Sequence, residues 1–331
     1  NEHFSTNLTL GHNLRIETSE QVNVGGSNLI IPQFYNVSTR TGELSGGQGQ
    51  SEYRRYGVYG DLTLGYNDFL FLNFTARNDW SSTLPEGNRS FFYPGGGISL
   101  VVSEALPGLV SDNGVSYLKA AVNVTKTGND PGVYQNNGTF FAPSNFPYGS
   151  TAGLSQSSAD PDPNLGPEFT TSYEAGIEYG LFRNRITGNV TLYRTNSTDQ
   201  IIPVNVSLAS GAASTTINIG EIENKGIEFD LLATVIRSDD FTWNLGVNYS
   251  GYESEVLSLA NGVEELEIGG YSNAQVVARV GEPYPLIRTS AWERDPQGRV
   301  IVGDDGNPLQ SSTFATQGKT TPDYVVGLNT T

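Results

Sequence analysis

The residue types that most often carry out chemistry are few in this chain and are poorly spaced for it. The only histidines are His3 and His12, and cysteine is absent, which excludes thiol nucleophiles, disulfides and cysteine-ligated zinc. Residues 160–164 (DPDPN) imitate the start of a calcium loop, but the two prolines and Thr171 at the twelfth position break that pattern. We therefore expect no catalytic residues, no metal site and no cofactor.

Four carboxylates resemble the paired acids of general acid–base catalysis: Glu174, Glu178, Glu228 and Asp230. Each lies in the polar half of an alternating apolar and polar segment. Because successive side chains of a strand point to opposite faces, these acids would share the polar face of a sheet. We interpret them as lining a water-filled interior rather than as a catalytic pair.

The segments that carry these acids form the clearest pattern in the chain, at residues 169–252. Apolar residues alternate with polar ones over 169–179, and the pattern resumes at 186–192 after the polar break at 183–184. The same unit then repeats over 227–235 and 241–250, with a turn at 237–240. Two alternating runs separated by a short polar break predict a β-hairpin, so this stretch predicts two hairpins.

The rest of the chain extends this pattern. Further strands are expected at 4–17, 53–66, 69–80, 90–103 and 115–127, with another from 323. Long loops are expected at 19–52, 81–89, 128–168, 197–223 and 254–320, the last with a small hairpin around 299–302. Short connections (67–68, 104–114, 182–184 and 237–240) alternate with these loops, so all long loops fall at one end of a meander. Short periplasmic turns opposite long extracellular loops are typical of an all-β, antiparallel, up-and-down transmembrane β-barrel.

Composition narrows the function. Only 16% of residues are charged and 11% are aromatic, which favours strands over the helices of an α/β enzyme. The formal net charge of −17 argues against nucleic acid as a partner, because phosphate binding needs concentrated lysine and arginine. No apolar run reaches the roughly 18 to 20 residues of a transmembrane helix. The chain begins close to an alternating strand without a signal peptide, so we expect a fragment or a partial mature protein.

Four ordered segments resemble the SusC/RagA-like family of TonB-dependent transporters. Residues 164–186 (NLGPEFTTSYEAGIEYGLFRNRI) are similar to that family's NPNLKWETT…NIGLDFGLFNNRI segment. Residues 218–228 (NIGEIENKGIE) resemble NVGEMENKGFE, and 118–129 (LKAAVNVTKTGN) resemble LKLRASYGQTGN. Residues 321–324 match the TPDY that opens a late strand. The resemblance extends over about residues 50–331.

This resemblance implies an outer-membrane barrel that is plugged by an N-terminal domain, energised by the TonB complex and capped by a SusD-like lipoprotein. It implies import of oligosaccharides or peptides by a Bacteroidetes-type bacterium. About ten strands are expected here against 22 in such transporters, so residues 1–331 would be a partial barrel domain without plug, TonB box and last strands. Such an open sheet would need further strands to be stable in outer-membrane lipid. The alternative is a soluble or surface-attached all-β adhesin or lectin-like protein.

Aromatic residues are the remaining candidates for function. Five of them lie in the expected 128–168 loop, where rings could stack on sugars or fill peptide pockets: Tyr134, Phe140, Phe141, Phe146 and Tyr148. Packing within the loop or against a lipoprotein cap is the alternative for this set. Four others belong either to aromatic girdles at the membrane surfaces or to the packing of the wall: Trp80, Tyr93, Trp243 and Tyr249.

Overall fold

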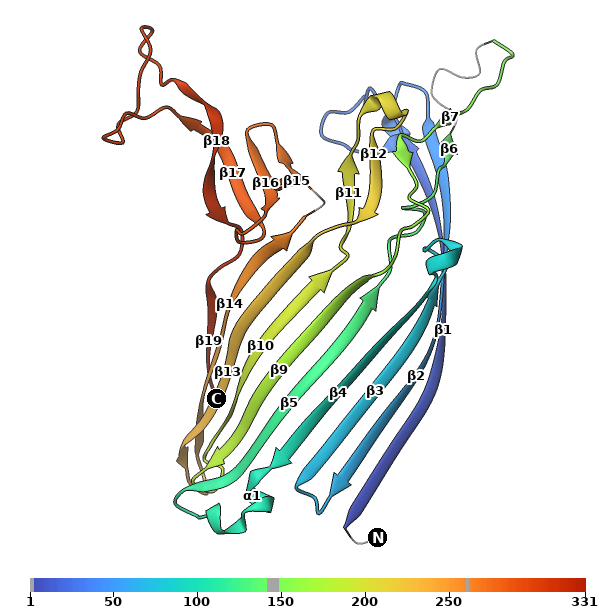
Figure 1. Ribbon diagram of the computed structural model, residues 1–331. Coiled ribbons are helices and arrows are strands. Elements are labelled where there is room, and N and C mark those ends of the chain that lie inside the picture. Colours follow the sequence, from blue (N-terminus) through green and yellow to red (C-terminus); the bar gives the residue numbers. More distant parts are fainter. Residues whose placement is uncertain (1–2, 142–148, 260–261) are drawn as a thin grey trace.

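A computed structural model of the chain describes residues 3–141, 149–259 and 262–331. The main element of this part is a ten-stranded antiparallel sheet in which each strand pairs with the next sheet strand along the chain (Figure 1). The strands are β1 (Phe4–Gly25), β2 (Ser45–Tyr66), β3 (Leu70–Ser81), β4 (Ser90–Val101), β5 (Val115–Asn129), β9 (Glu168–Leu181), β10 (Ile186–Thr198), β13 (Glu221–Arg237), β14 (Thr242–Ser258) and β19 (Tyr324–Thr330). The predicted all-β, up-and-down architecture is confirmed. The sheet is open, with β1 at one edge and β19 at the other.

The two hairpins predicted within residues 169–252 are β9–β10 and β13–β14. In the first turn Phe182, Arg183 and Asn184 have φ values of 55°, 56° and 57°. Turns with positive φ match the right-handed twist of the strands that they join. Arg183 donates a hydrogen bond of 2.6 Å to Asp112 in the preceding connection, and this bond lowers the pKa of the Asp112 carboxyl. The pair is mostly exposed, so it adds little to stability.

Connections of different length lie at opposite ends of the sheet (Figure 1). One end carries the tight turns and the 102–114 connection with the short helix α1 (Val102–Ala105). The other end, the loop end, carries residues 26–44, 82–89, 130–167, 199–220 and 259–323. The predicted one-sided arrangement is therefore confirmed, although the 82–89 loop is shorter than the 102–114 connection.

The loops contain more strand than the sequence predicted. A four-stranded antiparallel sheet occupies most of the last loop, where we expected only the small hairpin: β15 (Glu265–Tyr271), β16 (Ala274–Arg279), β17 (Leu286–Trp292) and β18 (Gln310–Lys319). Shorter pieces in the earlier loops are β6 (Phe140–Phe141), β7 (Ser155–Gln156), β8 (Ala159–Asp160), β11 (Ile201–Asn205) and β12 (Ser214–Asn218). β1 and β2 are also longer than predicted, and the expected 19–52 loop is reduced to 26–44. Their tips, 17–24 and 45–50, consist mostly of polar residues and glycine, so apolar alternation is weak there.

The register of the large sheet separates two faces. On one, which we call the apolar face, a single row across six strands consists of Leu72, Ile98, Val122, Ala175, Leu192 and Ile227. Ile98, Val122 and Leu192 are 55%, 58% and 55% exposed. Large hydrophobic side chains exposed in a continuous band are expected where a barrel wall contacts lipid. The opposite face, the polar face, carries the predicted acids.

Aromatic residues mark both ends of the apolar face. Phe4 and Tyr66 lie together near the tight turns, with ring centroids 5.0 Å apart. Tyr56 and Trp80 lie together near the loop end, at 5.5 Å. The girdle interpretation therefore fits Trp80, but it is wrong for Tyr93, whose hydroxyl donates to Asp79 on the polar face.

Trp243 and Tyr249 are also on the apolar face, in the same half of the alternation as Leu245 and Val247. Tyr249 stacks on Tyr324 of β19, with ring centroids 6.1 Å apart. The Trp243 indole N–H donates to the Thr330 hydroxyl at 2.7 Å. These two aromatic residues therefore also join β14 to β19.

Fully buried apolar side chains gather at the loop end rather than between the faces of the sheet. Leu84, Phe91 and Leu165 form part of one such core beside β3 and β4. Val256, Val277, Ala278 and Leu286 are buried where the β15–β18 sheet meets β14, and Gly281 N donates to the Val256 carbonyl at 2.8 Å. No helix of the described residues is long and apolar enough to cross a membrane.

Candidate functional site

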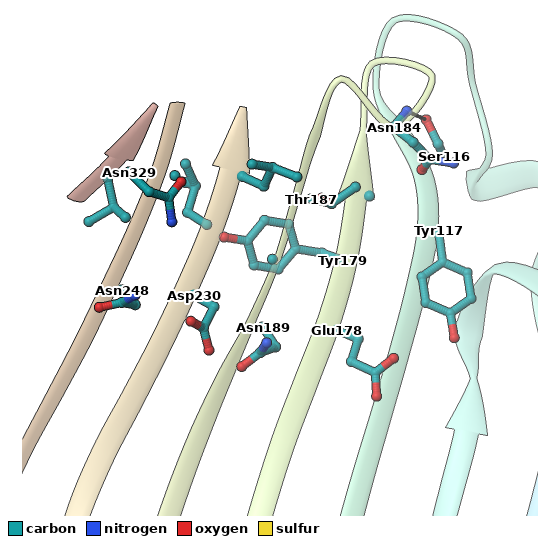
Figure 2. A pocket seen from close by; sticks show the side chains of 16 residues that line it. Ser116, Tyr117, Glu178, Tyr179, Asn184, Thr187, Asn189, Asp230, Asn248 and Asn329 are labelled. Atoms are coloured by element: carbon teal, nitrogen blue, oxygen red, sulfur yellow. Dashed lines mark hydrogen bonds between the residues drawn. The ribbon is translucent and has the colours of Figure 1, made fainter. Parts of the chain in front are cut away.

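The polar face brings the predicted acids into one surface. Register places Lys119, Glu178, Asn189, Asp230 and Asn248 in one row across β5, β9, β10, β13 and β14. Figure 2 shows four of them in line on adjacent strands. The Lys119 ammonium lies 2.9 Å from the Glu178 carboxylate. An asparagine separates Glu178 from Asp230, so these acids do not form the close pair that acid–base catalysis would use.

A hollow of about 660 Å³ lies on this face near the tight turns. Its lining includes amide, hydroxyl and carboxylate side chains, among them Asn184, Thr187 and Asn329 (Figure 2). Asn184 and Asn329 each lie over a glycine of the neighbouring strand, Gly180 and Gly246. The surface is therefore hydrophilic and can exchange hydrogen bonds with water or a polar solute.

At the loop end, the polar face carries a buried ionic cluster. Asp79 of β3 is fully buried and accepts hydrogen bonds from Arg55 at 2.6 Å and from Arg77 at 2.9 Å. The Tyr93 hydroxyl is a further donor to Asp79. Asp130, the first residue after β5, accepts from Arg55 at 2.9 Å and from the hydroxyls of Ser81 and Thr83. We call Arg55, Arg77, Asp79, Tyr93 and Asp130 the rim cluster.

The rim cluster fixes a long loop to the wall. Asp130 begins the 130–167 loop, while Arg55 and Asp79 belong to strands β2 and β3. Each carboxylate has charged and neutral donors, so its burial is compensated by hydrogen bonds. The Arg55 guanidinium also lies over the Phe91 ring, 5.4 Å from its centroid, in a cation–π arrangement. The cluster therefore positions the loop entry; it presents no exposed reactive group.

The aromatic residues predicted to bind ligand lie in this same loop. Tyr134 contacts β2, where its hydroxyl accepts from the Glu52 N–H at 3.3 Å. Phe140 and Phe141 form the two-residue strand β6 against β7 and are 67% and 51% exposed. Phe146 and Tyr148 fall outside the described residues. Because the rings of Phe140 and Phe141 are open to solvent, their role in ligand binding stays a prediction.

Other sequence candidates have ordinary structural roles. The His3 ring hydrogen-bonds the Asn67 side chain at 2.6 Å, and the His12 ring lies beside Tyr56. At the calcium-like run, Asn164 N donates to the Asp162 carboxylate at 2.8 Å, as in a plain Asx turn.

Comparison with known proteins shows the family to which this chain belongs. A family model described as "TonB dependent receptor-like, beta-barrel" matches residues 1–330. The chain belongs to the TonB-dependent receptor-like β-barrel family. TonB-dependent receptor P3 of Formosa agariphila is 26% identical over 82% of this chain and 30% of its own length. TonB-dependent receptor SusC of Bacteroides thetaiotaomicron is 31% identical over 59% of this chain and 20% of its own.

Solved structures agree on the fold of this TonB-dependent receptor domain. The RagAB peptide transporter superposes with a TM-score of 0.81 at 20% identity, over 99% of this chain and 37% of that chain. The chain spans about 30% of the length of the first curated relatives. Membership of this family, which is one of outer-membrane barrels, confirms the predicted β-barrel fold and favours it over the soluble adhesin or lectin-like alternative. The family consists of receptors and transporters rather than enzymes.

Proposed function

We propose that residues 1–331 form part of the barrel wall of a longer outer-membrane importer for oligosaccharides or peptides. The polar face would line the lumen, and the loop end would form the extracellular vestibule. The supporting observation is the division of one sheet into an exposed apolar face and a hydrophilic face with amides and carboxylates. The SusC relative supports a TonB-dependent receptor, and the RagAB structure of the same fold is that of a peptide transporter.

Two partners belong to the same proposal. TonB would supply energy through parts of the protein outside residues 1–331, and a SusD-like lipoprotein would cap the loop end. The loops at that end together span most of the residues outside the large sheet, which gives a cap an extended surface to contact. In this proposal the chain binds and admits its substrate without transforming it.

Uptake by the intact organism tests the proposal. We expect that deletion of the gene abolishes uptake of one class of labelled oligosaccharide or peptide, and that the full-length gene restores it. A protonophore should block the restored uptake, because TonB-dependent transport draws on the proton-motive force of the inner membrane. Recovery of the mature protein in a detergent-free soluble fraction, after release from the envelope by salt, would contradict the proposal.

The exposed phenylalanines of β6 allow a sharper test of the vestibule. Replacing Phe140 and Phe141 together by alanine should weaken the apparent affinity for the transported substrate about fivefold or more, since two ring contacts are lost. Concentration-dependent uptake gives this value. The control is Phe182→Leu, an exposed phenylalanine at the opposite end of the sheet. Equal affinities for both variants and the parent would remove Phe140 and Phe141 from the binding surface.

A further inference from the structure

The apolar face changes character abruptly at the loop end of β13 and β14. Along β13, the residues of the apolar face beyond Ile227 toward the loop end are Lys225 and Glu223. Along β14, the residues of the same face beyond Gly251 are Glu253 and Glu255. Register pairs Lys225 with Glu253, two residues beyond the Ile227–Gly251 pair. Side chains two apart share a face, so these charges point outward above the apolar band. This level of a barrel wall meets the lipid headgroups.

Two adjoining hollows occupy this level. The lower one, of about 590 Å³, is lined on the apolar side by Leu192, Ile227 and Tyr249. The upper one, of about 390 Å³, has the acidic residues Glu223 and Glu255 in its lining. Four residues line both hollows: Lys225, Glu253, Lys319 and Asp323. The lower hollow therefore joins an apolar floor to a charged upper edge.

Two lysines supply the positive charge in the lining of the lower hollow. Lys225 lies 3.4 Å from Glu253, and Lys319 lies 2.7 Å from Asp323. The side chains of Glu253 and Asp323 are 78% and 81% exposed. Exposed ion pairs of this kind are weak, so a phosphate that offers more acceptor oxygens can replace either carboxylate. Arg194 is different, since its partner Glu223 is only 12% exposed and holds it at 2.5 Å.

Aromatic side chains complete the lower hollow. The Tyr249 hydroxyl lies over Gly251, where a Cβ would overlap it, and the Tyr249 ring stacks on Tyr324. Tyrosine rings with the hydroxyl toward water are favoured at the membrane interface. Gly251 has no side chain of its own, and the Tyr249 hydroxyl fills the space over it.

Building on the membrane location proposed above, we propose that the lower hollow binds the phosphate-bearing headgroup of a lipid in the outer leaflet. Lys225 and Lys319 hold the phosphate, and an acyl chain lies along Leu192, Ile227 and Tyr249. Both hollows are lined by the carboxylates of Glu253 and Asp323, and the upper one adds Glu223 and Glu255, so a phosphate is repelled less in the lower hollow. A lipid fits better than a substrate of the importer, because register places Lys225, Ile227 and Tyr249 of this hollow on the apolar face.

Lipid retention by the purified full-length protein tests this site. The probes are nanodiscs that contain diphosphorylated lipid A, and matched nanodiscs with the same lipid after enzymatic dephosphorylation. We expect the parent protein to retain the phosphorylated lipid through a detergent wash and to release the dephosphorylated one. The Lys225→Gln, Lys319→Gln double variant should bind the phosphorylated lipid roughly tenfold to thirtyfold more weakly.

Lys119→Gln is the matched control, because it removes a lysine of the polar face and should leave lipid retention unchanged. Heat-resistant migration of the folded barrel verifies that each variant is folded, and the parent's preference for phosphorylated lipid tests the site without any variant. Equal retention of both lipids, or full displacement of the lipid by millimolar inorganic phosphate, would overturn the proposal. We expect the double variant to take up substrate normally although it has lost the lipid. This result would show that the lipid site can fail while the proposed import function remains.

Discussion

Replacing Asp79 by alanine should lower the free energy of unfolding by about 3 to 5 kcal/mol. The reason is that Asp79 is fully buried and accepts hydrogen bonds from Arg55, Arg77 and Tyr93. Removal of one partner from a buried ion pair leaves the other charge without compensation, which costs about this much. Arg55 would keep Asp130, whereas Arg77 would keep its 2.9 Å hydrogen bond to Asn13 and its position over the Tyr59 ring but no carboxylate partner among the described residues. Urea unfolding of the full-length protein in detergent, followed by loss of the heat-resistant folded form, measures the change.

The matched control for this prediction is Asp61→Ala. Asp61 is an aspartate on the polar face of β2 that accepts a hydrogen bond of 3.2 Å from Asn73 and has no salt bridge among the described residues. We expect its loss to cost about 1 kcal/mol or less. Similar destabilisation by both substitutions would mean that the rim cluster adds nothing beyond an ordinary hydrogen bond. The Asp79→Ala variant should also expose the 130–167 loop to proteases, because Arg55 and Asp130 lose a neighbour that fixes them.

Leu231→Arg should destabilise the barrel by about 2 to 4 kcal/mol, the cost of a cation in the middle of the lipid-facing wall. Leu231 occupies the central rows of the apolar band, with Val247 beside it on β14 and Gly188 beside it on β10. Along β14, the alternate residues of the apolar face run from Trp243 to Gly251, and Val247 lies midway between these two residues. The expected readout is a fall in the temperature at which the folded form is lost in lipid vesicles.

The adjacent residue gives an unusually close control. Leu232 is the next residue of β13, is 47% exposed and is placed on the polar face by its register with Thr187 and Gly246. Leu232→Arg therefore adds the same side chain to the same strand, one position away, but on the face that meets water. We expect it to cost less than 1 kcal/mol. If Leu232→Arg proved the more damaging of the two, the assignment of faces would be inverted.

Local alternation was sufficient to predict the face of most residues of β9, β10, β13 and β14, because the side-chain period of a strand is a property of neighbouring residues. The tips of β1 and β2 were missed for the same physical reason. Their residues are mostly polar or glycine, so the apolar period that identifies a strand is weak there. Alternation also failed at Val235, where a bulge between Thr234 and Ile236 pairs Ile236 with Trp243. The β15–β18 sheet escaped prediction because its strands are short, and a bulge between Glu267 and Gly269 interrupts the period of β15.

The rim cluster could not be predicted from local patterns. Arg55 and Asp130 are 75 residues apart, and Arg55 and Asp79 are 24 apart. Their contact depends on the register of β2 with β3 and on the path of the chain after β5, neither of which alternation specifies. The sequence signal was limited to charged residues in the polar half of their strands. Tyr93 illustrates the same limit, since its aromatic character suggested a girdle while register places it beside Asp79.

The contacts between bulky side chains and glycines on the polar face bear on how the strands find their partners. The Asn123 amide lies where a Cβ of Gly97 would be, the Tyr193 hydroxyl reaches the corresponding place at Gly226, and Asn329 does so at Gly246. A strand that joined its neighbour one residue out of step would turn these side chains to the wrong face, and a shift of two would set them against a residue with a side chain of its own. Complementary side-chain sizes on adjacent strands thus favour one alignment during assembly. The residues that fill the spaces over these glycines therefore also restrict the register in which neighbouring strands can pair.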